Sequence, residues 1–128
     1  MSIQLPRPEL KCHDEAMRLP FPKLAGQLRE LLGARLVAYI GSVKETRAVR
    51  EWAEGRRPSE DVVARLRLAY GIARCIADSD GPETAQAWFQ GLNPMLDDVS
   101  PARLLREGDL DVAGPAVRTA ERHFLASG

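Results

Sequence analysis

Residues 60–78 read EDVVARLRLAYGIARCIAD, and this stretch determines the type of fold. Its apolar residues recur at helical spacing and cover more than half of the circumference of a helix. They are Val62, Val63, Leu66, Leu68, Ala69, Ile72, Ala73 and Ile76. A helix that is apolar on so many sides must be buried against several neighbours. The sequence therefore predicts a long central helix surrounded by other elements.

The segments on both sides of this helix also have helical patterns. A leucine stripe at positions 24, 28, 31 and 32 predicts one helix that ends near Gly33. Further helices are predicted over residues 34–40, 44–54, 83–90, 101–108 and 115–125. No stretch alternates with the period of two that a strand requires. We therefore predict an all-α fold, in which a helix-turn-helix lobe (23–58) is joined by the long helix to a small helical lobe within 59–128.

The first 22 residues differ from the rest, because they contain Pro6, Pro8, Pro20 and Pro22 and show no sustained periodicity. Proline lacks a backbone N–H and disrupts the interior of a helix. Residues 1–22 are therefore expected to form an extended or disordered leader.

Composition and charge limit the classes of function. The chain is 45% hydrophobic and 28% charged, and it has no apolar run of the roughly 20 residues that span a bilayer. It also has no secretory signal, so the expected location is the cytoplasm, with no membrane partner. Residues 34–76 have a net charge of +4 and residues 77–128 a net charge of −5. The basic middle part suits phosphates, and the acidic part suits a protein partner.

Residues that carry catalysis or bind metals do not form a recognisable pattern. Cys12 and Cys75 are 63 positions apart, which is no metal-ligand spacing, and both are expected to be reduced thiols. His13 and His123 are the only histidines, and the chain has no phosphate-binding glycine loop or nucleophile motif. We therefore expect no enzymatic activity, no cofactor and no metal.

Residues 44–58, KETRAVREWAEGRRP, have the pattern of a DNA-reading helix. Ala48, Val49, Trp52 and Ala53 share one face, which is expected to be buried. The opposite face carries hydroxyl and guanidinium groups, which can bond base edges in the major groove, and cationic groups beside it suit phosphates. The candidate DNA-binding residues are Lys44, Thr46, Arg47, Arg50, Arg56 and Arg57. The alternative is a solvated face, on which Arg47–Glu51 and Arg50–Glu54 form ion pairs at i,i+4 spacing.

The string LVAYIGSVKETRAVREWAEGRRP (36–58) resembles the DNA-binding core of Xre-type, lambda-repressor-like regulators. The resemblance is carried by Thr46, Val49, Trp52 and Gly55. The interval from Gly41 to Val49 is about two residues longer than in typical members, which predicts an enlarged turn.

The string AWFQGLNPMLDDVSPARLLREGDLDVAGPAV (87–117) resembles the toxin-binding domain of the Xre/MbcA/ParS antitoxins. An aromatic helix, an Asn-Pro turn, a Leu-Leu helix and a Gly-Asp turn follow one another in the order of that family. The resemblance implies an antitoxin of a type II system, which blocks the active site of a RES-type, NAD-consuming toxin. It also implies repression of the antitoxin's own operon through operator DNA, as a homodimer within a larger complex.

The residues assigned to the toxin surface follow from this second resemblance and from the small C-terminal tail, which could enter a cleft. They are Asn93, Leu96, Asp97, Asp98, Arg103, Arg106, Ser127 and Gly128. Two other interpretations remain open. One is a stand-alone Xre-family regulator that uses its C-terminal domain for dimerisation. The other is an adaptor whose helix-turn-helix no longer binds DNA.

Overall fold

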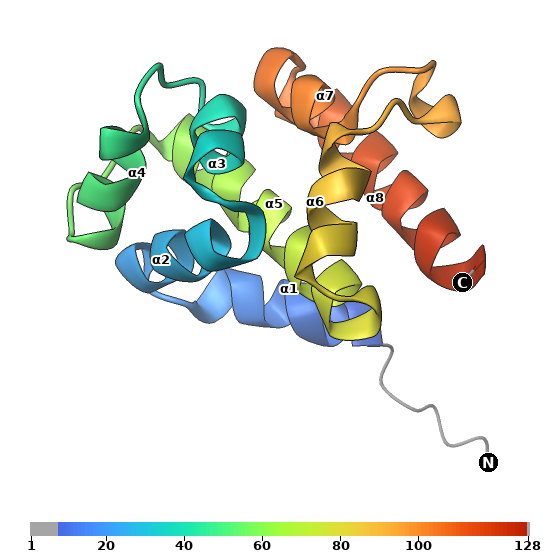
Figure 1. The fold of residues 1–128 in the computed structure, drawn as a ribbon, viewed down its shortest axis with the longest axis horizontal. Helices are drawn as coiled ribbons and strands as arrows, with labels where there is room; N and C mark the ends of the chain where they lie inside the picture. The colour runs from blue at the N-terminus through green and yellow to red at the C-terminus, as the bar shows by residue number, and fades with distance from the viewer. Residues whose placement is uncertain (1–7, 128) are drawn as a thin grey trace.

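The computed structural model describes residues 8–127, and within this range the chain is all-α, as predicted. It contains eight α-helices and one short 3-10 helix (Figure 1). In chain order these are α1 (Pro8–Arg18), α2 (Phe21–Leu32), α3 (Ala34–Ile40), α4 (Thr46–Ala53), α5 (Glu60–Asp80), α6 (Pro82–Gln90), η1 (Pro94–Leu96), α7 (Pro101–Glu107) and α8 (Leu110–Ser127).

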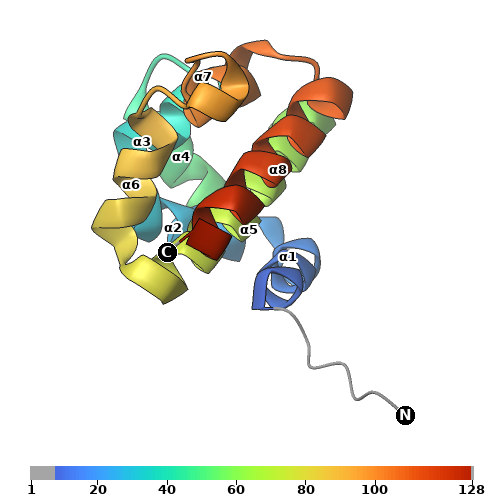
Figure 2. The same cartoon turned by 90° about the vertical axis from the view of Figure 1, so that its right-hand side faces the viewer.

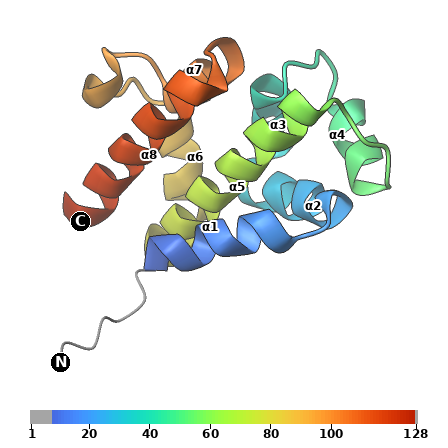
Figure 3. The same ribbon diagram turned by 180° about the vertical axis from the view of Figure 1, so that it is seen from behind.

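Helix α5 is the central element, as the sequence predicts. It packs against α1, α2, α6 and α8, and more weakly against α3 and α7. Figure 2 shows α8 running alongside α5, and Figure 3 shows α1 lying against α5 on another side. Leu66, Ala69, Tyr70, Ile72 and Ile76 of α5 are fully buried. Their neighbours belong to one continuous core that extends from α1 to α8. The predicted boundary between two lobes therefore stays a prediction.

The expectation of an extended or disordered leader is wrong for residues 8–22, and residues 1–7 lie outside the described range. Residues 8–18 form α1, because Pro8 occupies the first helical position, where a missing N–H has no cost. Pro20 is the N-cap of α2, and Pro22 follows in its first turn. The prolines thus begin helices and do not interrupt them. Arg67 of α5 donates to the carbonyl oxygens of Ala16 (2.9 Å) and Leu19 (2.8 Å) and so caps the end of α1.

The last helix begins five residues earlier than predicted, at Leu110 and not at Pro115. Asp109 satisfies the start of α8, since its side chain accepts from the N–H of Asp111 (3.0 Å) and its carbonyl accepts from Ala113 (2.7 Å). Pro115 lies inside the helix near this start. There it removes one hydrogen bond of a long helix whose buried face, with Ala113 and Val117, keeps it packed.

Helices α2, α3 and α4 pack against one another and position the predicted DNA-reading segment. Val49 and Trp52 are buried, which confirms the prediction for these two residues of the inner face of α4, whereas Ala48 and Ala53 are half-buried. The Trp52 ring meets Phe21 edge-on, with centroids 6.4 Å apart. A Cβ at Gly41 would lie 2.8 Å from this indole, so only glycine allows α3 and α4 to approach this closely.

The turn between α3 and α4 spans residues 41–45. Arg65 of α5 stabilises this turn, because it donates to the carbonyl of Ile40 (3.2 Å) and to the hydroxyl of Ser42 (3.4 Å). Ser42 itself has a positive φ of 60°. Helix α4 begins at Thr46, two residues later than predicted, so Lys44 and Glu45 belong to this turn.

Within residues 8–127, none of the helices combines the length and the apolar composition that crossing a membrane requires.

We expect the stability of the fold to decrease at alkaline pH because of Tyr70. Its hydroxyl is buried on α5, donates to Glu15 Oε1 (3.2 Å) and lies 2.7 Å from Gln27 Oε1. Burial, together with the negative charge of Glu15, raises the pKa of Tyr70 from 10.0 to about 12. The folded state therefore keeps the proton while the unfolded state loses it. The contribution is fully present below pH 10 and is lost as the pH rises towards 12, by up to about 3 kcal/mol.

Urea unfolding across this pH range measures the effect, with Tyr70→Phe as the comparison. The phenylalanine variant loses about 1–3 kcal/mol at neutral pH, because Glu15 and Gln27 lose a partner. Its stability then falls less steeply than that of the wild type above pH 10. Parallel curves for the two proteins would contradict the role assigned to Tyr70.

Candidate nucleic-acid interface

The outer face of α4 presents the predicted DNA-binding side chains to solvent. Thr46 lies at the start of the helix, and Arg47 and Arg50 have side chains that are 67% and 58% exposed. Lys44 precedes them in the turn and is also exposed. The structure therefore brings Lys44, Thr46 and Arg47 together at the N-terminal end of α4, with Arg50 one turn further on.

Acidic neighbours contact these arginines. Arg47 Nε lies 3.6 Å from Glu51 Oε1, and Arg50 Nε lies 3.9 Å from Glu54 Oε1, so both ion pairs of the alternative interpretation are present. Arg47 also approaches Glu45, at 3.8 Å. Exposed pairs of this kind contribute only about 0–1 kcal/mol each. A phosphate or a base edge can therefore replace the carboxylate at little cost.

Arg56 and Arg57 lie beyond the end of α4. Arg56 bonds Glu51, which is thus shared with Arg47. Arg57 pairs with Glu60 (3.2 Å), and its guanidinium lies 5.8 Å from the centre of the Phe21 ring. Both side chains are more than half exposed. They extend the row of cations from α4 towards the start of α5.

A shallow groove of about 730 Å³ adjoins the N-terminal end of α4. Four cationic side chains line it, two from the predicted set and two from elsewhere, and Glu45 is the acidic residue among them. The polar and aromatic lining residues are Arg35, Tyr39, Lys44, Thr46, Arg47 and Arg106. This density of cations beside a helix N-terminus is the electrostatic arrangement that nucleic-acid phosphates require.

Arg106 of α7 is fixed in this groove by α3. Its Nη1 donates to the carbonyl of Tyr39 (2.7 Å), and its guanidinium stacks 4.6 Å from the centre of the Tyr39 ring. Arginine has five N–H donors, and the contact with the Tyr39 carbonyl occupies one of them. The sequence assigned Arg106 to the toxin surface, but the structure places it with Lys44 and Arg47.

Sequence reasoning missed Arg35 and Tyr39, although a signal was present. They are four residues apart on a helix whose other face, with Leu36, Val37 and Ile40, is buried. Residues at i,i+4 spacing share one face of a helix. Both side chains are exposed, so a cation and an aromatic ring on this face of α3 were recognisable.

The other residues assigned to the toxin surface lie mainly in the loop after α6. The Asn93 side chain accepts from the N–H of Met95 (3.0 Å), and Asn93 and Val99 pair through their backbones. Asp97 and Asp98 are exposed and have positive φ angles of 55° and 61°. The loop is thus a tight, closed turn with two carboxylates at its tip.

Two apolar residues of this loop, Leu96 and Met95, differ in exposure. Leu96 is 6% exposed and packs in the core, so it holds the loop in place and is not available as a contact residue. Met95 is 46% exposed, because the 3-10 turn directs it away from Leu96.

The remaining residues assigned to the toxin surface are Arg103, Ser127 and Gly128. Arg103 is exposed on α7 and pairs with Glu107 of the same helix at 3.0 Å. Ser127 is the last residue of α8, and its hydroxyl donates to the carbonyl of Phe124 (3.1 Å). The C-terminal tail, for which entry into a cleft was considered, is helical up to Ser127, because α8 continues while its apolar face still packs. Gly128 lies outside the described residues.

A small hollow of about 260 Å³ joins the loop to the end of α8. Its lining includes Trp88, Leu92, Asn93, Met95, Phe124 and Ser127. Leu92 is 74% exposed, and Met95 is next to it. We call this surface the Leu92–Met95 patch. Exposed apolar side chains around a hollow are typical of a protein-binding surface.

No protein-family model, curated protein or solved structure matches this chain. The Xre and antitoxin resemblances therefore stay predictions based on the sequence motifs.

Proposed function

We propose that this chain is the antitoxin of a type II toxin-antitoxin system, which represses its own operon by binding operator DNA and neutralises a RES-type toxin. The observation that carries the DNA-binding part is the cationic groove formed by α3, the following turn, the start of α4 and Arg106. In this arrangement Thr46, Arg47 and Arg50 read base edges, and Lys44, Arg35 and Arg106 hold phosphates.

Lys44→Ala and Arg106→Ala are each expected to weaken binding to all DNA sequences to a similar extent. Each substitution removes one phosphate contact, so the slope of log K against log salt decreases by about 1. Arg47→Ala weakens binding to the operator more than binding to unrelated DNA, by about 1–3 kcal/mol if it pairs with a guanine. Fluorescence anisotropy with the chain's own upstream region and an unrelated duplex, over a range of salt concentrations, measures both effects.

Arg103→Ala is the matched control for Arg106→Ala. Both arginines belong to α7, but Arg103 pairs with Glu107 and does not line the groove. Its removal should leave the affinity and the salt slope unchanged. Equal effects of the two substitutions would argue against the groove and in favour of non-specific attraction.

The toxin-binding part of the proposal is supported by the Leu92–Met95 patch and the carboxylates beside it. The patch is apolar and the surrounding segment is acidic, which suits a basic toxin surface that binds an anionic dinucleotide. In cells that produce a RES-type toxin, the wild-type chain is expected to restore growth. Leu92→Asp should abolish this rescue, whereas Val112→Asp, at an apolar residue on α8 that is also 72% exposed, should retain it.

The stand-alone regulator is the alternative, and it differs in one outcome. It binds operator DNA with the same groove but does not rescue growth in the presence of any RES-type toxin. The adaptor interpretation is favoured by the four ion pairs that Glu45, Glu51 and Glu54 form with the cations on and just after α4. It is accepted if the wild-type chain shows no preference for its own upstream DNA.

A further inference from the structure

Three helices bring His13, Cys75 and Glu121 together in the interior, although these residues are far apart in the sequence. One ligand atom from each residue lies within 4.8 Å of those of the other two. His13 comes from α1, Cys75 from α5 and Glu121 from α8. Cys75 is 5% exposed, Glu121 is fully buried and the His13 side chain is 13% exposed.

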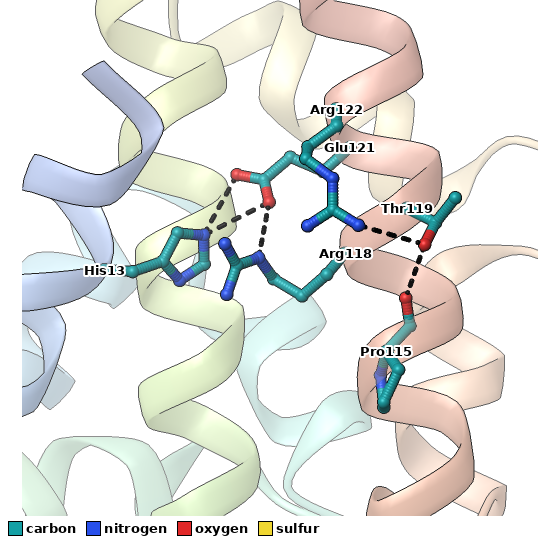
Figure 4. A network of polar contacts seen from close by, with 6 residues as sticks. All are labelled: His13, Pro115, Arg118, Thr119, Glu121 and Arg122. Carbon is teal, nitrogen blue, oxygen red and sulfur yellow. Dashed lines mark hydrogen bonds and ion pairs between the residues drawn. The ribbon is translucent and has the colours of Figure 1, made fainter. Parts of the chain in front are cut away.

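Glu121 is the only charged residue among the buried side chains of the described part of the chain. Both of its oxygens lie 3.1 Å from His13 Nε2, and Arg118 Nε donates to Oε1 at 3.1 Å (Figure 4). A buried carboxylate is costly unless it is paired or bound to a metal. The contact with Arg118 leaves Oε2 facing the histidine.

Gly71 of α5 leaves the space that the imidazole ring of His13 occupies. A Cβ at this position would lie 2.3 Å from His13 Nδ1 and 2.7 Å from Cε1. The ring therefore packs directly on the backbone of α5, one helical turn before Cys75. Any larger residue at position 71 displaces the ring from Glu121 and Cys75.

We propose that His13, Cys75 and Glu121 form a zinc-binding site that joins α1, α5 and α8. Imidazole nitrogen, thiolate sulfur and carboxylate oxygen are the three ligand types that zinc uses in proteins. Ligand atoms around one tetrahedral zinc ion lie about 3.3–3.8 Å apart, given bonds of about 2.0–2.3 Å. The separations in the structure, 3.1 Å between His13 Nε2 and the Glu121 oxygens and at most 4.8 Å within the group, lie on both sides of this distance.

The charges of this group suit a divalent ion. Binding replaces the thiol proton of Cys75 by zinc and releases that proton to solvent, so the thiolate and the carboxylate bring two negative charges to the ion, while Arg118 stays beside the carboxylate as a cation. Arg118 then becomes an outer partner that orients the ligating carboxylate.

A cavity reaches the site at Cys75. A cavity of about 1110 Å³ lies between α1 and the C-terminal ends of α5 and α8, and Cys75 lines it. Cys12 lines the same cavity and is hydrogen-bonded to Cys75. A water molecule that enters from this side completes a tetrahedral site with three protein ligands.

Cobalt(II) is the probe for this site, because it takes the place of zinc and absorbs visible light. The full chain, freed of metal with a chelator, is expected to bind one Co²⁺ with the intense visible bands of tetrahedral coordination and a sulfur-to-cobalt band in the near ultraviolet. One equivalent of Zn²⁺ displaces it, and zinc raises the melting temperature of the chain. A wild-type spectrum without a sulfur-to-cobalt band overturns the proposal.

Variants separate this site from other thiols. Cys75→Ser removes the sulfur band, whereas Cys12→Ser, at the other buried cysteine, keeps it. Gly71→Ala retains all three ligands and the helix but displaces the His13 ring, so it should weaken Co²⁺ binding at least as much as the loss of an outer partner does, about 10–100-fold. Far-ultraviolet circular dichroism confirms that each variant is folded. A band that persists in Cys75→Ser, or that is lost in Cys12→Ser alone, contradicts the assignment.

Discussion

Replacement of Trp52 by alanine is expected to lower the free energy of unfolding by about 3–5 kcal/mol, because it leaves a large cavity in a close-packed region. The indole is 3% exposed and lies between Phe21 and the backbone of Gly41. It is the side chain that attaches α4 to α2 and α3. Urea unfolding followed by circular dichroism measures the change.

The second tryptophan provides the matched control for this substitution. Trp88 is only partly buried and packs at the edge of the core, against Phe89 and Phe124. Trp88→Ala should therefore cost less than Trp52→Ala. The free energy of unfolding of Trp52→Phe, which keeps an aromatic ring, should lie between those of the wild type and Trp52→Ala. If Trp88 proved the more costly of the two residues, the packing assigned to α4 would be wrong.

Arg118→Met is expected to cost about 3 kcal/mol or more, although it changes a side chain that is partly exposed. Removal of one partner of a buried ion pair leaves the other charge without compensation, which costs about 3–5 kcal/mol. Here the remaining charge is the carboxylate of Glu121, which is fully buried, loses the guanidinium of Arg118 and keeps its contacts with His13 and Cys75. Unfolding is measured in the presence of a chelator, so that metal binding does not contribute.

A double-mutant cycle tests the cause of this loss. When Glu121→Gln is added to Arg118→Met, no buried charge remains, and most of the lost stability should return. Arg122→Met is the surface control, because Arg122 bonds Thr119 (3.2 Å), and Figure 4 marks no hydrogen bond or ion pair between Arg122 and Glu121. Its effect should stay within about 0.5 kcal/mol. Additive effects of Arg118→Met and Glu121→Gln would show that the two residues are not coupled.

The sequence predicted α5 and α4 well because their signals are local. The apolar positions of α5 cover most sides of the helix. On α4, Val49 and Trp52 are at i,i+3 spacing and so share one face. Such periodicity reports which side of a helix meets the core. The prediction needed no knowledge of what the partner elements are.

The predictions for α1 and for the start of α8 were wrong, because a proline can either begin a helix or interrupt one. Pro8 and Pro22 stand in the first turns of helices, where they are favourable, and Pro115 lies within α8, where the cap at Asp109 and a long packed face outweigh the lost hydrogen bond. A proline in a sequence marks a restricted backbone, but it does not tell whether a helix begins or ends there.

For the candidate sites too, local sequence patterns identified some residues and not others. The cations of α4 were found from spacing alone, whereas the position of Arg106 beside Lys44 and Arg47 was not predicted. It reaches Tyr39 across 67 residues of chain, and no local pattern contains that contact.

By itself, the sequence determined the all-α fold, the central position of α5 and the division of α4 into a buried and a solvated face. The reason is that the periodic spacing of apolar residues in a helix involves only residues that are close together in the chain. Only the tertiary structure decided that Arg35 and Arg106 share a groove with Lys44, and that His13, Cys75 and Glu121 meet within 4.8 Å. These groups come from helices that are distant in the chain. Their meeting depends on how α1, α7 and α8 pack around α5 and α3, and packing is a property of the whole molecule.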